Sequence, residues 1–172
     1  MLFIKFIIIN SLVLLKRIIS HLWNNYKVYR KWGLLLDRNQ IIRSVENISI
    51  GSRFGISPNC QLFAQGDLGD GTIIIGDNVA MNYNVMINAD GGGKIIIGND
   101  VRIGPYTIMR AANHRFDDIA QPIYKQGRNP GQITIEDDVW LGAHVTLLPN
   151  IKIGKSSIIG AGSVVTSDIP PF

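Results

Sequence analysis

The sequence predicts an all-β solenoid, a stack of coils built from short strands and turns. Aliphatic residues recur every six residues from Ile135 to Val165, and the residue four places after each is small or β-branched. A period of six fits neither an α-helix, with about 3.6 residues per turn, nor a flat strand, with a period of about 2. Fixed self-similarity of this kind is typical of repeat architectures. The recurring positions are Ile135, Leu141, Leu147, Ile153, Ile159 and Val165.

Each six-residue unit is interpreted as one short strand followed by a turn. The lead aliphatic side chain points inward, and the small residue four places later fits a tight corner. Gly142, Gly154 and Gly160 directly follow lead residues, and we expect them to supply the backbone freedom that the bend needs. Three units close one triangular coil, which buries its apolar face only by stacking on its neighbours. About five coils can be counted, starting at residues 50, 75, 97, 135 and 153.

The repeat also runs upstream of Ile135, with three interruptions. Two are short and rich in Gly and Asp, near residues 64–72 and 88–94, and are typical of surface turns. The third, residues 110–134, is long, and a long excursion on a compact scaffold is usually functional or disordered. The predicted domains are therefore a solenoid over residues 46–172, with this excursion, and an N-terminal helical segment over residues 1–45.

The N-terminal segment combines an apolar run with a more amphipathic stretch. Residues 2–15 are almost wholly apolar, yet short for a bilayer span, and no small-residue cleavage site of a signal peptide follows. Trp23, Tyr26 and Trp32 lie among Lys and Arg residues, which is typical of a helix in an anionic membrane surface. This predicts a cytoplasmic protein held at the inner face of the membrane. A helix that caps the solenoid or packs against sister subunits fits the same pattern.

Charge and cysteine content exclude several classes of function. Residues 1–53 carry nine Lys or Arg and two acidic groups, so the formal net charge of +4 belongs to the N-terminus and not to the repeats. No basic stripe with interleaved aromatic residues follows the repeats, so nucleic acid is not an expected partner. Cys60 is the only cysteine and falls at an inward corner, so we expect a small buried residue. The three histidines are far apart in sequence, and no metal site is expected.

Two sequence strings carry a family resemblance. Residues 137–143 (DDVWLGA) and 159–166 (IGAGSVVT), with Asn113-His114 in the long excursion, resemble the hexapeptide-repeat acyltransferases over about residues 48–171. The nearest branch is the galactoside, maltose and polysaccharide O-acetyltransferases. The resemblance implies a left-handed parallel β-helix and a homotrimer, with acetyl-CoA as acyl donor in the groove between adjacent subunits. It also implies a C-terminal segment beyond the position of Phe172 that helps to close over CoA.

The implied reaction is acetyl transfer to a carbohydrate hydroxyl, in surface polysaccharide or lipid-linked glycan biosynthesis. A sugar hydroxyl is a poor nucleophile at neutral pH, and a neutral imidazole can take its proton, which contributes roughly 10²–10⁴-fold in rate. The histidine that matches His114 is the catalytic base of the resembling family. Asp117 or Asp118 could orient the imidazole. The alternative is a loop histidine held by a local hydrogen bond.

The resemblance also assigns residues to the acyl donor. Ala143 matches the position whose backbone N–H stabilises the developing oxyanion, and Ala161 matches a backbone contact to the pantetheine arm. Trp140 lines the groove in the family, although packing against a neighbouring subunit explains it equally well. Thr166 and Ser167 correspond to contacts at the far end of CoA, where the family often has Lys in place of Ser167. The expected donor-binding set is Trp140, Gly142, Ala143, Ala161, Thr166 and Ser167.

Four polar residues are candidates for the acceptor site: Asn82, Asn84, Asp90 and Asn113. Asparagine ladders also stabilise solenoids, and Asp90 could simply serve its turn. His144, three places after Leu141, is expected on a strand and pointing outward. Asn150 stands where the family usually has Gly, and Asn tolerates the left-handed conformation better than most residues.

No nucleophile for a covalent intermediate stands out, because Cys60 and Ser163 are predicted to point into the core. Direct transfer in a ternary complex is therefore expected. Three alternatives share this fold: an acetyltransferase acting on amino sugars or xenobiotics, a zinc-dependent carbonic anhydrase, and a non-catalytic scaffold. The carbonic anhydrase would need clustered histidines, which the sequence lacks.

Overall fold

The computed structural model describes residues 2–36, 39–66 and 69–172. The chain forms two compact units, Met1–Leu36 and Asp37–Phe172. The first unit contains one long helix, α1 (Leu2–Trp32). The sequence predicted a solenoid that starts at residue 46, but the second unit begins earlier. Strand β1 (Ile41–Arg43) already belongs to it, because β1 pairs in parallel with β4 (Gln61–Phe63) of the solenoid.

Helix α1 exposes apolar side chains along much of its described length. Leu14, Leu22 and Trp23 are 59%, 61% and 60% exposed. The rings of Trp23 and Tyr26 stack with centroids 5.6 Å apart, and the Lys31 ammonium lies 4.9 Å from the centroid of the Trp32 ring. Within the described residues, no helical segment combines the length and the apolarity needed to cross a bilayer.

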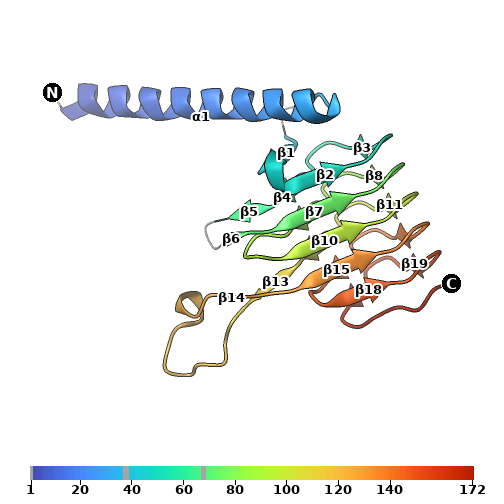
Figure 1. Cartoon of the computed structure of the whole chain (residues 1–172). Coiled ribbons are helices and arrows are strands. Elements are labelled where there is room, and N and C mark those ends of the chain that lie inside the picture. The colour runs from blue at the N-terminus through green and yellow to red at the C-terminus, as the bar shows by residue number, and fades with distance from the viewer. Residues whose placement is uncertain (1, 37–38, 67–68) are drawn as a thin grey trace. The chain divides into compact units, whose positions relative to one another are not determined.

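The second unit is a parallel β-helix whose wall consists of three sheets, which confirms the predicted solenoid (Figure 1). Sheet A has six strands: β1, β4, β9 (Met86–Asn88), β12 (Ile108–Arg110), β17 (Thr146–Leu147) and β20 (Val164–Val165). Sheet B has five strands: β2 (Ile48–Ile50), β7 (Thr72–Ile75), β10 (Lys94–Ile97), β15 (Gln132–Ile135) and β18 (Ile151–Ile153). Sheet C has five strands: β3 (Gly55–Ile56), β8 (Ala80–Met81), β11 (Arg102–Ile103), β16 (Trp140–Leu141) and β19 (Ile158–Ile159).

The lead aliphatic residues stack in register and form the core. In sheet B the column is Ile50, Ile75, Ile97, Ile135 and Ile153, which confirms the five predicted coil starts. Ile97 and Ile135 are each 1% exposed. Strand β1 adds a partial turn ahead of these coils, and the 3₁₀ helix η1 (Val45–Asn47) follows it. Coils bury their apolar edges only against one another, so the core is continuous along the stack.

The glycines that follow lead residues serve a different purpose from the predicted one. Gly142, Gly154 and Gly160 do not have positive φ, whereas the residues two places later do, as at His144 (56°) and Ser156 (59°). A Cβ atom on Gly142 would lie 2.6 Å from the Ala161 nitrogen of the next coil. Glycine is therefore needed at Gly142 for close stacking of backbones and not for a left-handed turn.

Three corners connect the sheets; we call them the AB, BC and CA corners after the sheets that they join. At the BC corner, acidic and amide side chains tie each coil to the next. The Ser52 N–H donates to Asp77 Oδ1 (2.6 Å), the Asp77 N–H to Asn99 Oδ1 (2.8 Å), and the Asn99 N–H to Asp137 Oδ1 (2.7 Å). The hydrogen bond from Ser52 holds the pKa of Asp77 below its ordinary value. This ladder satisfies backbone donors that the turns leave without strand partners.

All three interruptions of the repeat lie at the AB corner. The first contains a short antiparallel pair, β5 (Gln65–Gly66) and β6 (Gly69–Asp70). The long excursion begins and ends as an antiparallel ribbon of β13 (Ala112–His114) and β14 (Arg128–Pro130). Its loop carries the 3₁₀ helix η2 (Ile123–Lys125) and extends away from the stack of coils (Figure 1). The excursion is thus structured, and it presents residues beside the AB corner.

Candidate active site

The structure distributes the predicted site residues over two corners of the chain. Asn82, Asn84, Gly142, Ala143 and Ala161 lie at the CA corner, and Trp140 lies on β16 of sheet C. Asp90, Asn113, His114, Thr166 and Ser167 lie at the AB corner or on its excursion. The strands of sheet A run between these corners. One chain therefore does not bring the predicted base and the predicted oxyanion donor into one site.

The backbone of Ala143 is a free hydrogen-bond donor. The Gly142 N–H donates to Ile159 O (2.8 Å) and the His144 N–H to Pro105 O (2.8 Å), but no described residue accepts a hydrogen bond from the Ala143 N–H. Ala143 is half-buried. The corresponding position of the preceding coil is Pro105, which has no N–H at all. The turn at Pro105 therefore forms without an N–H at this position. The Ala143 N–H is not needed for the turn and is available to a ligand.

Aromatic groups line the CA corner and the adjoining face of sheet C. The rings of Tyr106 and His144 stack in parallel with centroids 4.7 Å apart. His144 lies in a turn at φ 56°, so the prediction that it lies on a strand was wrong. Trp140 is 55% exposed and stands in register with Arg102 of one neighbouring coil and Ile158 of the other. These rings form an exposed aromatic surface beside the Ala143 N–H.

Two predicted acceptor residues at the CA corner have local roles. Asn82 Oδ1 accepts a hydrogen bond from the Tyr83 N–H (2.8 Å). Asn84 has φ 60°, a conformation that asparagine adopts more readily than most residues. The turn itself therefore accounts for asparagine at both positions. Cys60 is fully buried nearby, and its thiol donates to Asn82 O (2.9 Å), as expected for a core residue.

His114 ends the β13 strand and is exposed. In the antiparallel ribbon it stands directly opposite Arg128, so both side chains project from the same face. Neither nearby aspartate orients its ring. The Arg115 guanidinium donates to Asp117 (3.0 Å) and lowers the pKa of that carboxyl, while Asp118 accepts from the Ala120 N–H (2.9 Å). The imidazole is therefore presented to solvent without a carboxylate partner among the described residues.

Charged groups from three segments meet at the AB corner next to this ribbon. Asp90 Oδ1 lies 3.8 Å from Arg110 Nη2, too far for a hydrogen bond, and it is buried without a hydrogen-bond partner. Arg128 Nε is also buried without a partner. Asn113 and its ribbon partner Asn129 are exposed. The sequence singled out Asp90 and Asn113 but missed Arg110 and Arg128, since only the fold brings them together.

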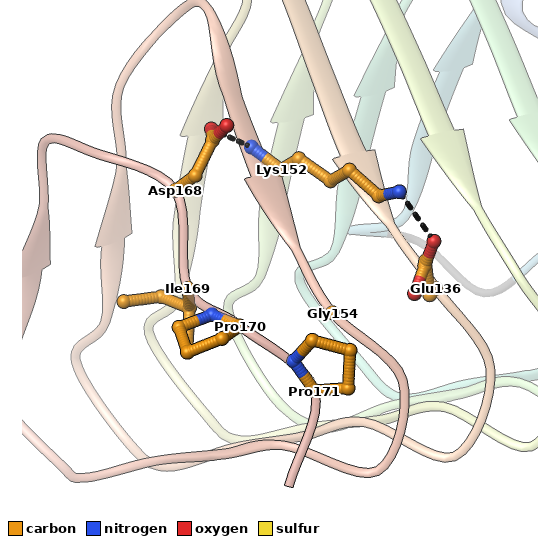
Figure 2. A pocket seen from close by; sticks show the side chains of 7 residues that line it. All are labelled: Glu136, Lys152, Gly154, Asp168, Ile169, Pro170 and Pro171. Atoms are coloured by element: carbon orange, nitrogen blue, oxygen red, sulfur yellow. Dashed lines mark hydrogen bonds and ion pairs between the residues drawn. The ribbon is translucent and has the colours of Figure 1, made fainter.

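Two hollows lie at the C-terminal end of the solenoid. One, of about 370 Å³, is lined by residues of β19 and β20 and by Thr166 and Ser167, the two predicted contacts of distal CoA. The other, also about 370 Å³, is lined by Glu136, Lys152 and Asp168 together with Gly154, Ile169, Pro170 and Pro171 (Figure 2). Figure 2 shows the Lys152 ammonium pointing at Glu136, 2.6 Å away. This pairing lowers the pKa of Glu136 and raises that of Lys152.

The described residues contain no group of three or more His, Cys, Asp or Glu side chains that could hold a metal ion. Ser163 is half-buried and accordingly less enclosed than predicted.

Comparisons with known proteins agree with the repeat and the fold. Residues 132–167 match the family described as bacterial transferase hexapeptide (six repeats). Over 105 residues, the chain is 37% identical to a galactoside O-acetyltransferase of Lactococcus lactis, a match covering 60% of this chain and 48% of that protein. A hexapeptide-repeat-containing acetyltransferase from Vibrio cholerae superposes with a TM-score of 0.57 at 30% identity, over 72% of this chain and 65% of that chain.

A third similarity concerns the fold alone. An N-acyltransferase from Bacillus cereus superposes with a TM-score of 0.65 at 24% identity, over 78% of this chain and 70% of that chain. Together with the coiled wall and the six-residue register, the match over residues 132–167 and the first two similarities show that the chain carries hexapeptide repeats folded as a parallel β-helix. It spans about half the length of the curated relatives that it matches.

Proposed function

We propose that the protein transfers an acetyl group from acetyl-CoA to a hydroxyl group of a carbohydrate, in surface polysaccharide or lipid-linked glycan biosynthesis. The observation that carries this proposal is the pair of complementary groups that the fold leaves available. These are the exposed imidazole of His114 and the unpartnered N–H of Ala143. The similarity to a galactoside O-acetyltransferase supports a sugar acceptor.

In the proposed reaction, His114 takes the proton of the acceptor hydroxyl as its oxygen attacks the thioester carbonyl carbon. The carbonyl oxygen becomes negatively charged, and the Ala143 N–H donates a hydrogen bond to it, which is worth on the order of 10²–10³-fold in rate. When the carbon–sulfur bond breaks, the imidazolium returns its proton to the departing thiolate of CoA. Asp90 Oδ1, buried without a hydrogen-bond partner, accepts a hydrogen bond from a hydroxyl of the acceptor, and the exposed Asn113 offers a further polar contact to it.

Acetyl-CoA, the acyl donor, lies along the side of this site formed by the CA corner. Trp140 contacts the acyl end, Gly142 leaves room for the thioester, and Ala161 donates its N–H to the pantetheine arm. No described residue accepts a hydrogen bond from the Ala161 N–H. Thr166 and Ser167 line a hollow that takes the far end of CoA.

The active site forms between two copies of the chain. His114 and Ala143 lie at corners separated by the strands of sheet A, so one copy supplies the base and the next supplies the oxyanion donor. A closed ring of such heterologous contacts gives a homotrimer with three equivalent sites.

Mixing two inactive variants tests this arrangement. We expect His114→Ala and Ala143→Pro each to lose acetyl transfer, the latter because proline has no N–H. The fold tolerates proline here, since Pro105 occupies the same position one coil earlier. Co-refolded in equal amounts, the two variants should recover about a quarter of wild-type activity, because that fraction of ring interfaces pairs two intact sides.

The outcomes separate the parts of the proposal. Turnover by His114→Ala alone would show that His114 is not the base. A mixture that stays inactive would show that both groups act in a site formed by one chain. A matched control is Pro105→Ala, which changes the same turn in the neighbouring coil. Acceptors are supplied as pairs of a sugar and its amino counterpart, so that N-acetylation of an amino sugar is recognised if it occurs. Calorimetry with acetyl-CoA identifies a scaffold that binds no donor.

We further propose that α1 attaches the protein to the cytoplasmic face of the membrane. Leu22 and Trp23, more than half exposed, would insert among the acyl chains, while the basic residues of the helix face anionic head groups. Flotation with phosphatidylglycerol vesicles tests this. Leu22→Ser with Trp23→Ser should abolish co-flotation, whereas Ile119→Ser, which removes a still more exposed apolar side chain from the excursion loop, should not. Co-flotation by the double variant would refute the attachment.

A further inference from the structure

Arg128 is a guanidinium for which the described chain provides no partner. Its Nε is buried and has no hydrogen-bond partner, and no described carboxylate lies within ion-pair distance of it. The aliphatic stem is held against the turn after Asp90, because a Cβ atom on Gly91 would lie 3.2 Å from Arg128 Cγ. The side chain is thus placed by packing, while its charge is left uncompensated. Buried donors without partners are rare in folded proteins, and each calls for a specific explanation.

Arg128 also faces the reacting end of the proposed site. In the antiparallel ribbon, residues directly opposite each other have Cβ atoms about 4.5–5.5 Å apart on one face. His114 and Arg128 form such a pair, and Ala112 and Pro130 form the next pair on that face. Ala112 Cβ and Pro130 Cβ both lie close to the Gly91–Gly92 turn. The face that carries His114 and Arg128 therefore looks toward the turn that carries Asp90.

The charges at this place do not balance. Asp90 has one cation near it, Arg110 at 3.8 Å, and Arg115 of the excursion is occupied by Asp117. Among the described residues, this leaves the guanidinium of Arg128 as an excess positive charge beside His114. Guanidinium groups bind carboxylates and phosphates through two parallel hydrogen bonds, a geometry that neutral sugars cannot offer.

We infer that the acceptor carries a negative charge, a carboxylate or a phosphate, which Arg128 binds while His114 deprotonates the hydroxyl that is acetylated. This inference rests on the proposed function and narrows its substrate class from carbohydrates in general to acidic ones. A uronic acid and a sugar phosphate both provide the required group. A phosphate of CoA has the same chemistry, and the experiment distinguishes the donor from the acceptor.

The test compares acceptors that differ only in charge. Release of the CoA thiol is followed with glucose, glucuronate and glucose 6-phosphate at constant ionic strength, since salt screens exposed charges. The quantity of interest is kcat/KM for each acidic acceptor divided by kcat/KM for glucose. We expect this ratio to exceed one in the wild type and to fall roughly 10- to 150-fold in Arg128→Gln, the range for a hydrogen bond to a charged group.

Two further variants sharpen the comparison. Arg128→Lys keeps the charge but not the paired geometry, so the ratio should lie between those of the wild type and Arg128→Gln. Lys155→Gln removes one positive charge from an exposed side chain at the BC corner and should leave the ratio unchanged. A ratio of one in the wild type, or a ratio that Arg128→Gln does not lower, overturns the inference. If Arg128→Gln instead raises the KM for acetyl-CoA equally with every acceptor, Arg128 binds the donor and the inference is wrong.

Failure of the proposed function gives a different result. In that case no acceptor releases thiol from acetyl-CoA, and the inference is decided by binding alone. Saturation-transfer NMR should then detect glucuronate more strongly than glucose with the wild type and equally with Arg128→Gln. Equal signals from both sugars with the wild-type protein would refute an anion site at Arg128.

Discussion

Replacing Gly142 by alanine tests why glycine follows the lead residue of a coil. The added Cβ would lie 2.6 Å from the nitrogen and 2.9 Å from the Cα of Ala161, and 3.0 Å from Ile159 O. All three are backbone atoms of the next coil, so none of them can move without separating the two coils. Overpacking of this kind costs about 1–3 kcal/mol. Alanine also restricts the unfolded chain, which offsets about 0.4–1 kcal/mol.

We therefore expect Gly142→Ala to lower the free energy of unfolding by about 1–2 kcal/mol, which for a chain of this size corresponds to a fall in Tm of about 2–8 °C. Gly160→Ala is the matched control, because Gly160 holds the same place in the next coil and a Cβ there would meet only Ser163 Oγ, at 3.8 Å. This variant should match the wild type or exceed it slightly. Both are measured by thermal unfolding at one protein concentration. Equal losses in the two variants would show that the glycines serve turn conformation, and would refute the stacking argument.

Two further predictions concern stability. Asn150 has φ 64° and its Oδ1 accepts from the Gln132 N–H (3.1 Å), so Asn150→Gly should lose about 0.5–1.5 kcal/mol, and Asn150→Val a further 1–2 kcal/mol or so for the left-handed backbone. Denaturant midpoints check this, and a valine variant as stable as the glycine variant would contradict it. The Lys152 hydrogen bond lowers the pKa of Glu136 from its ordinary 4.5. Its contribution is thus present above that value and lost as pH falls through the lowered pKa, so Glu136→Gln should be less stable than wild type at pH 7 and converge with it in acid. A stability difference that persists at low pH would argue against the pair.

The six-residue period was enough to predict the coils, because inward lead residues and stacked registers are two descriptions of the same constraint. The six-residue period did not predict strand β1. Its buried residue, Ile42, is separated from Ile50 by η1, so the spacing to the first counted coil is not six. The role of the glycines was also misread, since the sequence does not show which backbones approach each other.

The residues of the candidate site were harder to predict from the sequence than the fold was. His114 was found from its resemblance to a family motif, yet its ribbon partner Arg128 has no periodic signal. The register of β13 on β14 pairs these two residues, and register within a polar excursion follows from tertiary packing on the Gly91–Gly92 turn. Three glycines directly after Asp90 were the one sequence sign that another segment approaches closely there.

Departures from the repeat mark where chemistry is possible in this fold. In the CA corner, the position two places after the sheet C lead residue is Pro58, Tyr83, Pro105, Ala143 and Ala161 in successive coils. The two prolines have no N–H, and the Tyr83 N–H is taken by Asn82. Among the described residues, a backbone N–H without an acceptor therefore occurs at this position in the last two coils alone. Those coils lie within the matched segment 132–167. A regular solenoid pairs most of its own backbone groups, so a donor that it leaves open at a repeated position is available to a ligand or to water.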